Sequence, residues 1–353
     1  MPEIPCVYLL CSGLPIVLII LIVTVVHTLI WPNTSGMRRK DRTGKDHVGK
    51  GRTGKDHNHT VKKSRIPPIP GPKVCSPLAH TRKNGRDCLP DSVIETLRRN
   101  RPVKSGGSSV SKGSLTKNNT ENVTKELAKE LGCKANDPRC MVERSLISHK
   151  EKKHLLDSFF RPKMPDTWKK DPKLWLNSDD IAVVMKQYQA AYPEFLFLGV
   201  VPIDFAAPDP YTGGNKKCMN DQFCHVNLAE EKAKGRKILG AVFNLDPHYK
   251  EGSHWVALAI DLKRGCSYYF DSYGMEPPQQ VARYMRYLTT QDPTLKLQRN
   301  GRRFQFLESE CGMYSMYFLI RMIAGESFKK FCKTPIRDKW MTEFRKTLFD
   351  ANA

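Results

Sequence analysis

The sequence predicts an α+β fold for the C-terminal part of the chain, and three observations indicate it. Residues 7–31 form one long uncharged run. Residues 32–120 are rich in Lys, Gly, Ser and Pro, whereas from residue 121 onward helical spacings alternate with short β-type runs. A chain of 353 residues with this uneven composition fits one folded domain behind a tail.

The uncharged run is long enough to cross a membrane. It follows a short tail, residues 1–6, and holds no Asp, Glu, Lys or Arg. At a rise of about 1.5 Å per residue it spans a hydrocarbon core of about 30 Å with some tilt, and Trp31 would lie at the interface. A cleaved signal peptide is the alternative, but the sequence shows neither its basic n-region nor an A-x-A site. We therefore expect a retained transmembrane helix at 7–31.

The charges on either side of this run predict its orientation. Only Glu3 is charged before it, whereas residues 37–65 carry 11 Lys or Arg and three Asp. By the positive-inside rule the rest of the chain lies on the cytoplasmic side of the membrane. Glycosylation takes place in the lumen, so the N-x-S/T sequons would stay unmodified. These sequons lie at Asn33, Asn58, Asn118 and Asn122.

The segment from 32 to 120 has the composition of a disordered linker. It holds the hexamer RTGKDH twice, at 42–47 and 52–57, then the stiff IPPIPGP at 66–72 and the flexible KSGGSSVSKGS at 104–114. With a net charge of +22 for the whole chain, the basic part at 37–65 suits contact with anionic lipid or nucleic acid.

The 11 cysteines do not form a recognisable framework. Their number is odd, they are spread along the chain, and no C-x-x-C pair occurs. We therefore expect reduced thiols, which indicate a reducing compartment, and neither a disulfide scaffold nor a zinc ribbon. Cys218, Cys224 and His225 come nearest to a metal-binding pattern, but their spacing favours ordinary loop and core residues. No metal and no cofactor are predicted.

Helical patterns begin the folded part. Residues 121–150 predict a helical hairpin, with Cys133 and Cys140 in its core. Its other apolar positions are Val123, Leu127, Leu131, Met141, Val142 and Leu146. A longer helix follows, with Asn177 or Ser178 as its N-cap and two aspartates in its first turn. The apolar face of this helix holds Ile181, Val184, Met185 and Tyr188.

The remainder, within a predicted domain at 151–353, mixes strands and helices. Residues 237–245 and 254–262 predict strands, the second half-buried because its apolar residues alternate. Residues 266–270 predict a third strand that ends in turn residues at 271–274. Helices are expected at 278–288 and in the apolar run that begins at Cys311.

Four side chains in this domain have the chemistry of a cysteine protease. Such an enzyme needs a thiolate, a base, a group that orients the base, and donors for an oxyanion. His254 begins one predicted strand and Asp271 ends the next, so a short turn can bring them together. Cys311 stands at a helix start, where the helix dipole lowers a thiol pKa, and Gln305 lies in the loop before it. Each residue alone is better explained by packing or turn formation, so the prediction depends on the set.

Four motifs resemble the ubiquitin-like-protein-specific protease family and its relatives, adenain and the core proteases of large DNA viruses. They are WLNSDDI at 175–181, HW at 254–255, FDSYG at 270–274 and Q-x5-CG at 305–312. The resemblance runs from about residue 150 to the C-terminus. It implies a papain-like cysteine protease fold in the circularly permuted order His, Asp, Gln, Cys.

The resemblance also implies a role for each residue. Cys311 would be the nucleophile, His254 the base and then the acid, Asp271 its orienting carboxylate, and Gln305 the oxyanion donor. Trp255 would roof a narrow channel for a Gly-containing substrate segment, and Trp175 would line the way into it.

One residue departs from the family pattern, and two others are alternatives to the assigned residues. Members of the family often carry Asp before the nucleophile, whereas this chain has Glu310. His248 and Asn244 are alternatives for base and orienting group, but neither has the matching spacing.

The implied function is a membrane-anchored cysteine endopeptidase that cleaves viral structural or core precursor proteins at Gly-containing sites. The resemblance also implies a virion or host membrane, with the protease domain on its cytoplasmic or virion-interior side. A deconjugase for a ubiquitin-like modifier is the first alternative. A Cys-dependent acyltransferase is the second, and a basic membrane tether that has kept the fold without the activity is the non-catalytic one.

Overall fold

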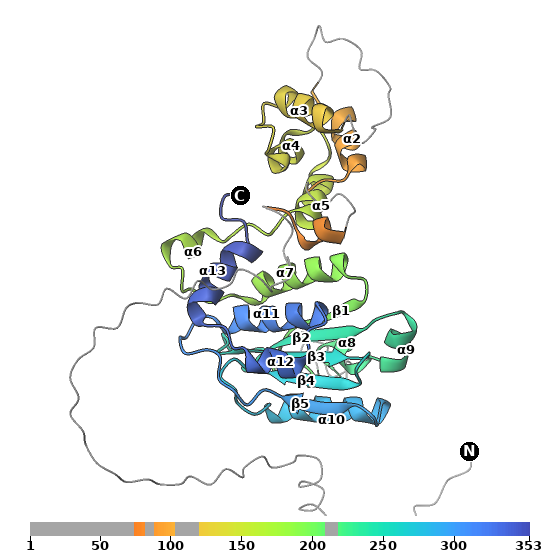
Figure 1. Cartoon of the computed structure of the whole chain (residues 1–353), viewed down its shortest axis with the longest axis vertical. Helices are drawn as coiled ribbons and strands as arrows, with labels where there is room; N and C mark the ends of the chain where they lie inside the picture. Colours follow the sequence, from red (N-terminus) through yellow and green to blue (C-terminus); the bar gives the residue numbers. More distant parts are fainter. Residues whose placement is uncertain (1–73, 82–87, 103–119, 209–217) are drawn as a thin grey trace, which may run out of the picture. The chain divides into compact units, whose positions relative to one another are not determined.

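The computed structural model describes residues 74–81, 88–102, 120–208 and 218–353 (Figure 1). The chain divides into compact units at 1–63 and 64–353, and all described residues belong to the second. The expected transmembrane run at 7–31, the basic stretch at 37–65 and the spacers at 66–72 and 104–114 lie outside the described residues. None of the helices in the described ranges is long and apolar enough to cross a membrane.

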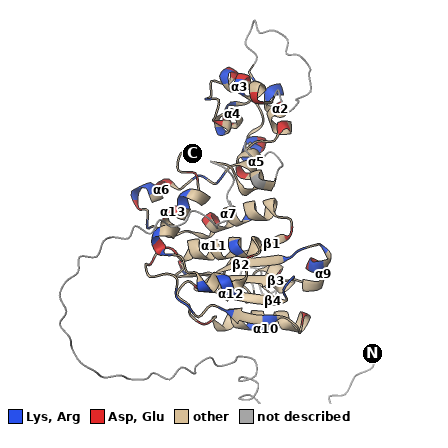
Figure 2. Ribbon diagram, viewed as in Figure 1, with Lys and Arg blue, Asp and Glu red and all other residues tan. Residues whose placement is uncertain are grey.

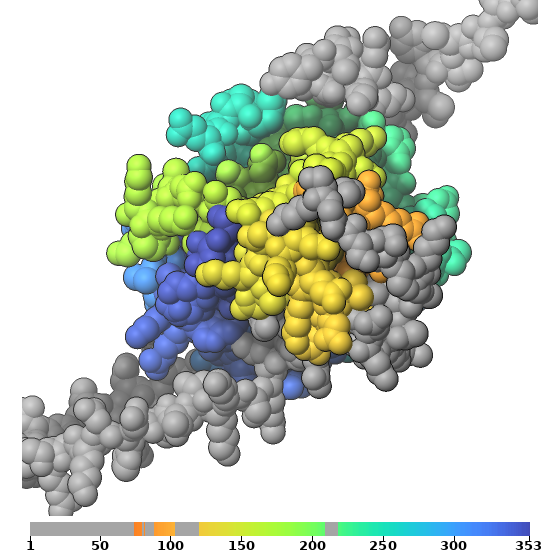
Figure 3. Space-filling model, turned by 90° about the horizontal axis from the view of Figure 1, so that it is seen from above, coloured from red at the N-terminus to blue at the C-terminus, as the bar shows by residue number. Residues whose placement is uncertain are grey.

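Residues 74–160 form a helical extension (Figures 1 and 3). Its elements are η1 (Pro77–Thr81), α2 (Asp91–Arg99), α3 (Thr120–Glu130), α4 (Pro138–Arg144) and α5 (His149–Phe159). The hairpin predicted at 121–150 is confirmed as α3 and α4. The linker prediction for 32–120 is wrong at 74–81 and 88–102. Although the sequence around α2 is basic, Ile94 and Leu97 form a short apolar stripe on this helix, and both side chains are buried. The boundary predicted after residue 150 falls inside α5.

Three disulfides among the described residues overturn the prediction of reduced thiols. They join Cys75 to Cys88, Cys133 to Cys140, and Cys218 to Cys224. The partners are separated by only 13, 7 and 6 residues, and each pair is brought together by a local fold that spacing alone does not reveal. Cys133 and Cys140 are therefore not core thiols, and Cys218 and Cys224 are neither loop thiols nor a metal pair. The free cysteines in the described ranges are Cys266, Cys311 and Cys332.

The extension has a small core of its own. Val123, Leu127, Leu131, Met141 and Val142 are buried in it as predicted. Leu146 is 66% exposed, which contradicts its predicted packing. It lies beyond Ser145, which ends α4 in an extended conformation. The helical spacing therefore no longer determines which way the Leu146 side chain points.

The C-terminal part is built on a five-stranded sheet in the order β1-β2-β3-β4-β5. The strands are β1 (Phe195–Pro202), β2 (Ile238–Asn244), β3 (Trp255–Asp261), β4 (Cys266–Phe270) and β5 (Lys296–Arg299). The inner pairs β2–β3 and β3–β4 are antiparallel, and the outer pairs are parallel. The α+β prediction is confirmed, with β1 and β5 as strands that the sequence patterns did not reveal.

Helices cover both faces of this sheet (Figure 1). On one face lie α7 (Ser178–Ala191), α11 (Cys311–Ile323), α12 (Phe328–Lys333) and α13 (Asp338–Leu348). On the other lie α8 (Asp221–Cys224), α9 (Leu228–Ala233) and α10 (Gln279–Gln291). Every residue of β3 is buried, so the half-buried strand predicted at 254–262 is wrong. Figure 2 shows that Lys, Arg, Asp and Glu residues lie mostly on helices and loops and are nearly absent from the central strands.

Two helix starts fix the geometry that matters for function. α7 begins after Asn177, whose side chain accepts from the Asp180 backbone N–H at 2.8 Å while the Asp180 carboxylate accepts from Asn177 in return. This capping box is the predicted N-cap, and it fixes the chain that leads in from α6 (Asp166–Lys170). α11 begins at Cys311 and is buried almost along its whole length.

Candidate active site

The sheet brings His254 and Asp271 together, as predicted. His254 stands just before β3 and Asp271 just after β4, and the register pairs Ala257 with Phe270. The start of one strand therefore lies beside the end of the other. Nε2 of His254 lies 2.7 Å from Oδ1 of Asp271.

Backbone and side-chain donors hold the Asp271 carboxylate in place. The backbone N–H of Tyr273 donates to Oδ1 at 2.8 Å. The Asn300 side chain bonds the backbone of Asp271 on both sides, accepting from its N–H at 2.9 Å and donating to its carbonyl at 2.6 Å. Because Asp271 is buried, these contacts fix the acceptor that orients His254.

Cys311 lies beside these two residues. Its side chain, 1% exposed, is near enough to the His254 ring to help raise the pKa of that ring. Since Nε2 faces Asp271, Nδ1 is the ring nitrogen left for the thiol. Burial lowers the pKa of His254, but the hydrogen bonds to Asp271 and Cys311 and their charges outweigh burial and raise it to about 9. The site therefore favours an imidazolium at neutral pH.

Gln305 lies in the loop that leads to Cys311, and the turn after β4 holds it. The Ser272 hydroxyl donates to Oε1 of Gln305 at 2.7 Å, and the Gln305 backbone N–H donates to the Ser272 carbonyl at 2.9 Å. Its amide nitrogen Nε2 donates to the carbonyl of Leu307 at 2.7 Å. The structure thus joins Gln305 to the residue that follows Asp271.

Trp255 packs over the first turn of α11. Its Nε1 donates to the carbonyl of Leu176 at 3.0 Å, which links the indole to the chain before α7. A Cβ at Gly312 would lie 3.2 Å from Cδ1 of Trp255, so glycine lets the helix approach the ring closely. Trp175, next to Leu176, is 42% exposed. The two tryptophans therefore border one segment, with Trp255 buried and Trp175 open to solvent.

The sequence patterns missed Tyr273, although FDSYG contains it. The Tyr273 ring stacks on the His254 ring with centroids 4.7 Å apart and an interplanar angle of 19°. The Arg303 guanidinium lies over two aromatic rings, 5.1 Å from the Tyr273 centroid and 5.0 Å from that of Phe306. The stack of Tyr273 on His254 limits the positions that the imidazole can adopt.

Two buried charged residues of α13 were also missed. The Asp338 carboxylate accepts from the backbone N–H groups of Phe306 and Leu307 at 2.9 and 3.1 Å, which shapes the loop before the nucleophile. Arg345 is 3% exposed and contacts Glu310. Its sequence signal is weak: Arg345 occupies the apolar stripe of α13, four residues after Met341 and three before Leu348.

The alternative residues belong to other contacts. Nδ1 of His248 lies 2.6 Å from Oδ2 of Asp204, and Oδ1 of Asn244 accepts from the backbone N–H of Ser253 at 3.3 Å. Neither pair replaces His254 and Asp271 beside Cys311. In the ranges that the structure describes, no group of three His, Cys, Asp or Glu side chains is placed to hold a metal ion.

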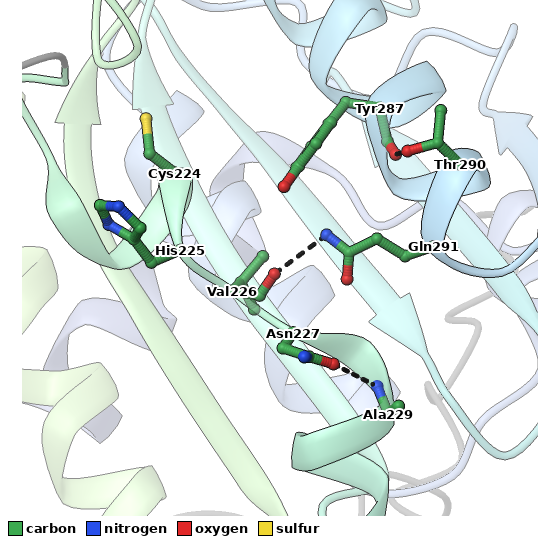
Figure 4. A pocket seen from close by; sticks show the side chains of 8 residues that line it. All are labelled: Cys224, His225, Val226, Asn227, Ala229, Tyr287, Thr290 and Gln291. Carbon is green, nitrogen blue, oxygen red and sulfur yellow. Dashed lines mark hydrogen bonds between the residues drawn. The ribbon is translucent and has the colours of Figure 1, made fainter.

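A separate pocket of about 530 Å³ lies between α8, α9 and α10 (Figure 4). Gln291 spans it, donating to the carbonyl of Val226 at 3.0 Å and accepting from the backbone N–H of Leu228 at 3.0 Å. Its lining residues are Cys224, His225, Val226, Asn227, Ala229, Tyr287, Thr290 and Gln291. None of these is a candidate catalytic residue.

Comparison with known sequences agrees with this geometry. Residues 214–353 match the family described as the Ulp1 protease family, C-terminal catalytic domain. A protein assigned as a thiol protease in Acanthamoeba polyphaga mimivirus is 34% identical over 164 residues, which are 44% of this chain and 49% of that relative. A cysteine protease of African swine fever virus is 34% identical over 135 residues, which are 35% of this chain and 49% of the viral enzyme. The chain spans about half the length of these curated relatives.

A solved structure shows that the fold is shared. The crystal structure of a protease from the same virus, African swine fever virus, has a TM-score of 0.54 and 20% sequence identity to this chain. It covers 82% of this chain, which is more than the part after residue 150, and 99% of that protein. The likeness in fold therefore extends into the helical extension.

Proposed function

We propose that this chain, whose C-terminal part belongs to the Ulp1 family of cysteine proteases, is an endopeptidase with Cys311 as its nucleophile. The observation that carries the proposal is the alignment of three side chains: the His254 ring is bonded to Asp271 at 2.7 Å and interacts with Cys311. A nucleophile, its base and the group that orients the base are present in one buried cluster.

The first step transfers the acyl group of the substrate to sulfur. Below its pKa of about 9 His254 is an imidazolium, and this charge and the N-terminus of α11 are placed to stabilise a thiolate at Cys311. The thiolate of Cys311 attacks the scissile carbonyl carbon. His254 then gives its proton to the leaving amine as the C–N bond breaks.

The second step releases the acyl group. His254, now neutral, removes a proton from water as the water attacks the thioester carbonyl. The carbon–sulfur bond breaks, the acid product leaves, and Cys311 regains its thiolate beside the imidazolium. Asp271 keeps the imidazole oriented in both steps and stabilises its positive charge.

Gln305 and the backbone N–H of Cys311 are the proposed oxyanion donors. The first N–H groups of a helix have no acceptor within the helix, so that of Cys311 is suited to bind an oxyanion. Nε2 of Gln305 donates to the Leu307 carbonyl in this structure, so its amide must turn toward the substrate to take this role. The hydroxyl of Ser272 holds Oε1 and limits that turn to a small one.

Trp175 and Trp255 are the proposed substrate-binding residues. Trp255 packs over Gly312, and Trp175 is partly open to solvent in the chain before α7. Two indoles on either side of an extended peptide leave little room for side chains, which favours glycine next to the cleaved bond. Protein substrates with Gly-containing sites follow, and viral structural or core precursors are our choice because both curated relatives are viral.

A deconjugase is the second candidate. The protease from one African swine fever virus isolate, 34% identical over 135 residues, is named a SUMO-1 cysteine protease. An acyltransferase has less support, since the viral relatives are all named as proteases.

The proposal includes membrane attachment through residues 7–31 and contact of the basic stretch at 37–65 with anionic lipid or nucleic acid. The disulfides help to choose between a virion and a host membrane. Because disulfides are rare in a reducing cytosol, three of them favour a virion over the cytosolic face of a host membrane.

Co-expression with candidate precursors tests the function. The full chain, wild type or Cys311→Ala, is produced with each precursor, and the new N-termini are sequenced. We expect cuts next to glycine with the wild type and none with the variant. Equal cleavage by both would exclude Cys311, release of an intact ubiquitin-like modifier would favour the deconjugase, and a mass gain without a cut would favour acyl transfer.

A further inference from the structure

Glu310, the residue before the proposed nucleophile, belongs to a buried ion pair that plays no part in the proposed reaction. Glu310 precedes Cys311 in the chain and is 1% exposed. Nε of Arg345, from α13, lies 3.5 Å from Oε2 of Glu310. Burying two charges costs free energy that a surface pair would avoid, so the position of this pair calls for an explanation.

The Arg345 guanidinium reaches three parts of the site. Its Nη1 donates to the carbonyl of Leu174 at 2.7 Å, one residue before Trp175. Its Nη2 donates to the carbonyl of Ser309 at 3.1 Å, two residues before Cys311. The group also lies over the Trp168 ring of α6, 4.9 Å from the centroid. One side chain thus connects the substrate-channel segment with the nucleophile loop.

The Glu310 carboxylate has its own supports. Its Oε1 accepts from the hydroxyls of Ser309 and Thr342 at 3.2 and 3.1 Å. Neither hydroxyl carries a charge, so the nearby positive charge comes from Arg345. A buried negative charge beside a thiol disfavours the thiolate, unless a cation balances it.

We infer that Arg345 is a positioning residue of the proposed peptidase, which aligns the Trp175 segment with the nucleophile loop and balances the Glu310 charge next to Cys311. The inference rests on the proposed function for its link to catalysis. Its claim about the surroundings of Cys311 rests on the contacts alone.

Other charged groups around Cys311 act differently. His254, held by Asp271, stabilises the thiolate directly. Glu308 is exposed, so water and salt screen its charge. Asp180 of α7 lies within electrostatic reach of Arg345 and is partly exposed. Glu310 is therefore the buried negative charge that Arg345 has to balance.

Alkylation of Cys311 tests the inference without a substrate. The full chain is treated with iodoacetamide across a pH series, and modification of the Cys311 peptide is followed by mass spectrometry, because the alkylation rate follows the thiolate fraction. We expect Arg345→Gln to raise the midpoint pH by about one unit. Glu310→Gln should lower it, and the double variant Glu310→Gln/Arg345→Gln should return it to the wild-type value.

Arg345→Lys separates charge from geometry. Lysine keeps the charge but lacks the planar fork that reaches Leu174 and Ser309 together, so the midpoint should stay near wild type. KM for a Gly-containing peptide should then rise several-fold with a smaller change in kcat.

Two results would overturn the inference. One is an unchanged midpoint in Glu310→Gln, a variant that keeps Arg345 and so does not depend on whether Arg345→Gln folds. The other is a shift in Arg345→Gln that the double variant does not reverse. If the midpoints move as expected but no variant or wild type cleaves a peptide, the proposed function fails while the electrostatic role of Arg345 stands.

Discussion

The helical extension and the catalytic domain are stabilised in different ways. The extension, residues 74–160, combines short helices and one small core with two of the three disulfides. The catalytic domain packs helices on both faces of a sheet and keeps Cys311 as a free thiol inside its core. A small core supplies little stability, so crosslinks supplement it in the extension. The larger core leaves a cysteine available for chemistry.

Buried polar groups show the same contrast. Among the described side chains of the extension, only Ser76 and Ser145 are buried polar residues. The catalytic domain buries Asp271, Gln305 and Arg345 together with many others, and most of these lie near Cys311. Buried polar groups cost stability unless they are paired. Their concentration therefore marks the region where the exact placement of side chains matters more than stability.

The largest expected effect comes from His254→Ala, which removes the base from the catalytic domain. We expect kcat/KM for a Gly-containing peptide to fall by about 10³-fold or more, since thiolate formation and protonation of the leaving amine both need the imidazole. Steady-state kinetics of the full chain check this. A loss of less than tenfold in folded protein would mean that another base serves Cys311.

Asp271→Asn should reduce kcat/KM by about 10²-fold and change its pH dependence. The pKa of His254 is about 9, above its ordinary value, so the imidazolium that protonates the leaving amine is present below that pH and activity is lost as pH rises through about 9. Asparagine removes the negative charge, the pKa of His254 falls, and the alkaline loss of activity moves to lower pH. A pH–rate profile with an unmoved alkaline limb would contradict the assigned role.

Gly312→Ala tests the contact between Trp255 and α11. The new Cβ would lie 3.2 Å from Cδ1 of Trp255 and push the indole outward. We expect KM to rise more than kcat falls, and a loss of about 1–3 kcal/mol in unfolding free energy from overpacking. Gly325→Ala is no control because its φ is +79°. Ser315→Ala in the same helix adds no volume but removes the bond from the Ser315 hydroxyl to the Trp255 carbonyl at 3.2 Å, so it shows the effect of weakening the Trp255 contact without overpacking.

The smallest effect on activity should come from Cys133→Ser/Cys140→Ser in the extension. Loop-closure entropy predicts a loss of about 2.5 kcal/mol for a crosslink of this span, confined to the extension. We expect kcat/KM to change by less than about twofold. Hydrogen exchange resolved along the chain measures both regions, with Cys332→Ser, which removes a free cysteine, as the matched control. Equal loss of protection in the catalytic domain would show that the two regions unfold as one.

The placement of the proposed catalytic residues was predictable because its signals are local. Asn177 caps α7 as the sequence indicates, and the positions of His254 and Asp271 at neighbouring strand ends follow from one short turn. The position of Cys311 at the start of a helix could be predicted from the apolar run that follows it in the sequence.

The rest depends on contacts between distant segments. Whether a cysteine pairs is decided by how the backbone folds, so Cys133 and Cys140 looked like core residues. β3 alternates in sequence but is covered on both faces, because α10 and α11 pack on opposite sides of it. Arg345 meets Leu174 across 171 positions of sequence, which no local pattern encodes.

Active-site labelling tests the central claim most directly. The full chain is incubated with a peptide that carries a chloromethyl ketone after its glycine, and the modified residue is identified by mass spectrometry. The account predicts an adduct on Cys311, formed at least about tenfold more slowly in His254→Ala, while Cys266 and Cys332 stay unmodified. Labelling of Cys266 or Cys332 in place of Cys311, or labelling of Cys311 at the same rate without His254, would contradict it.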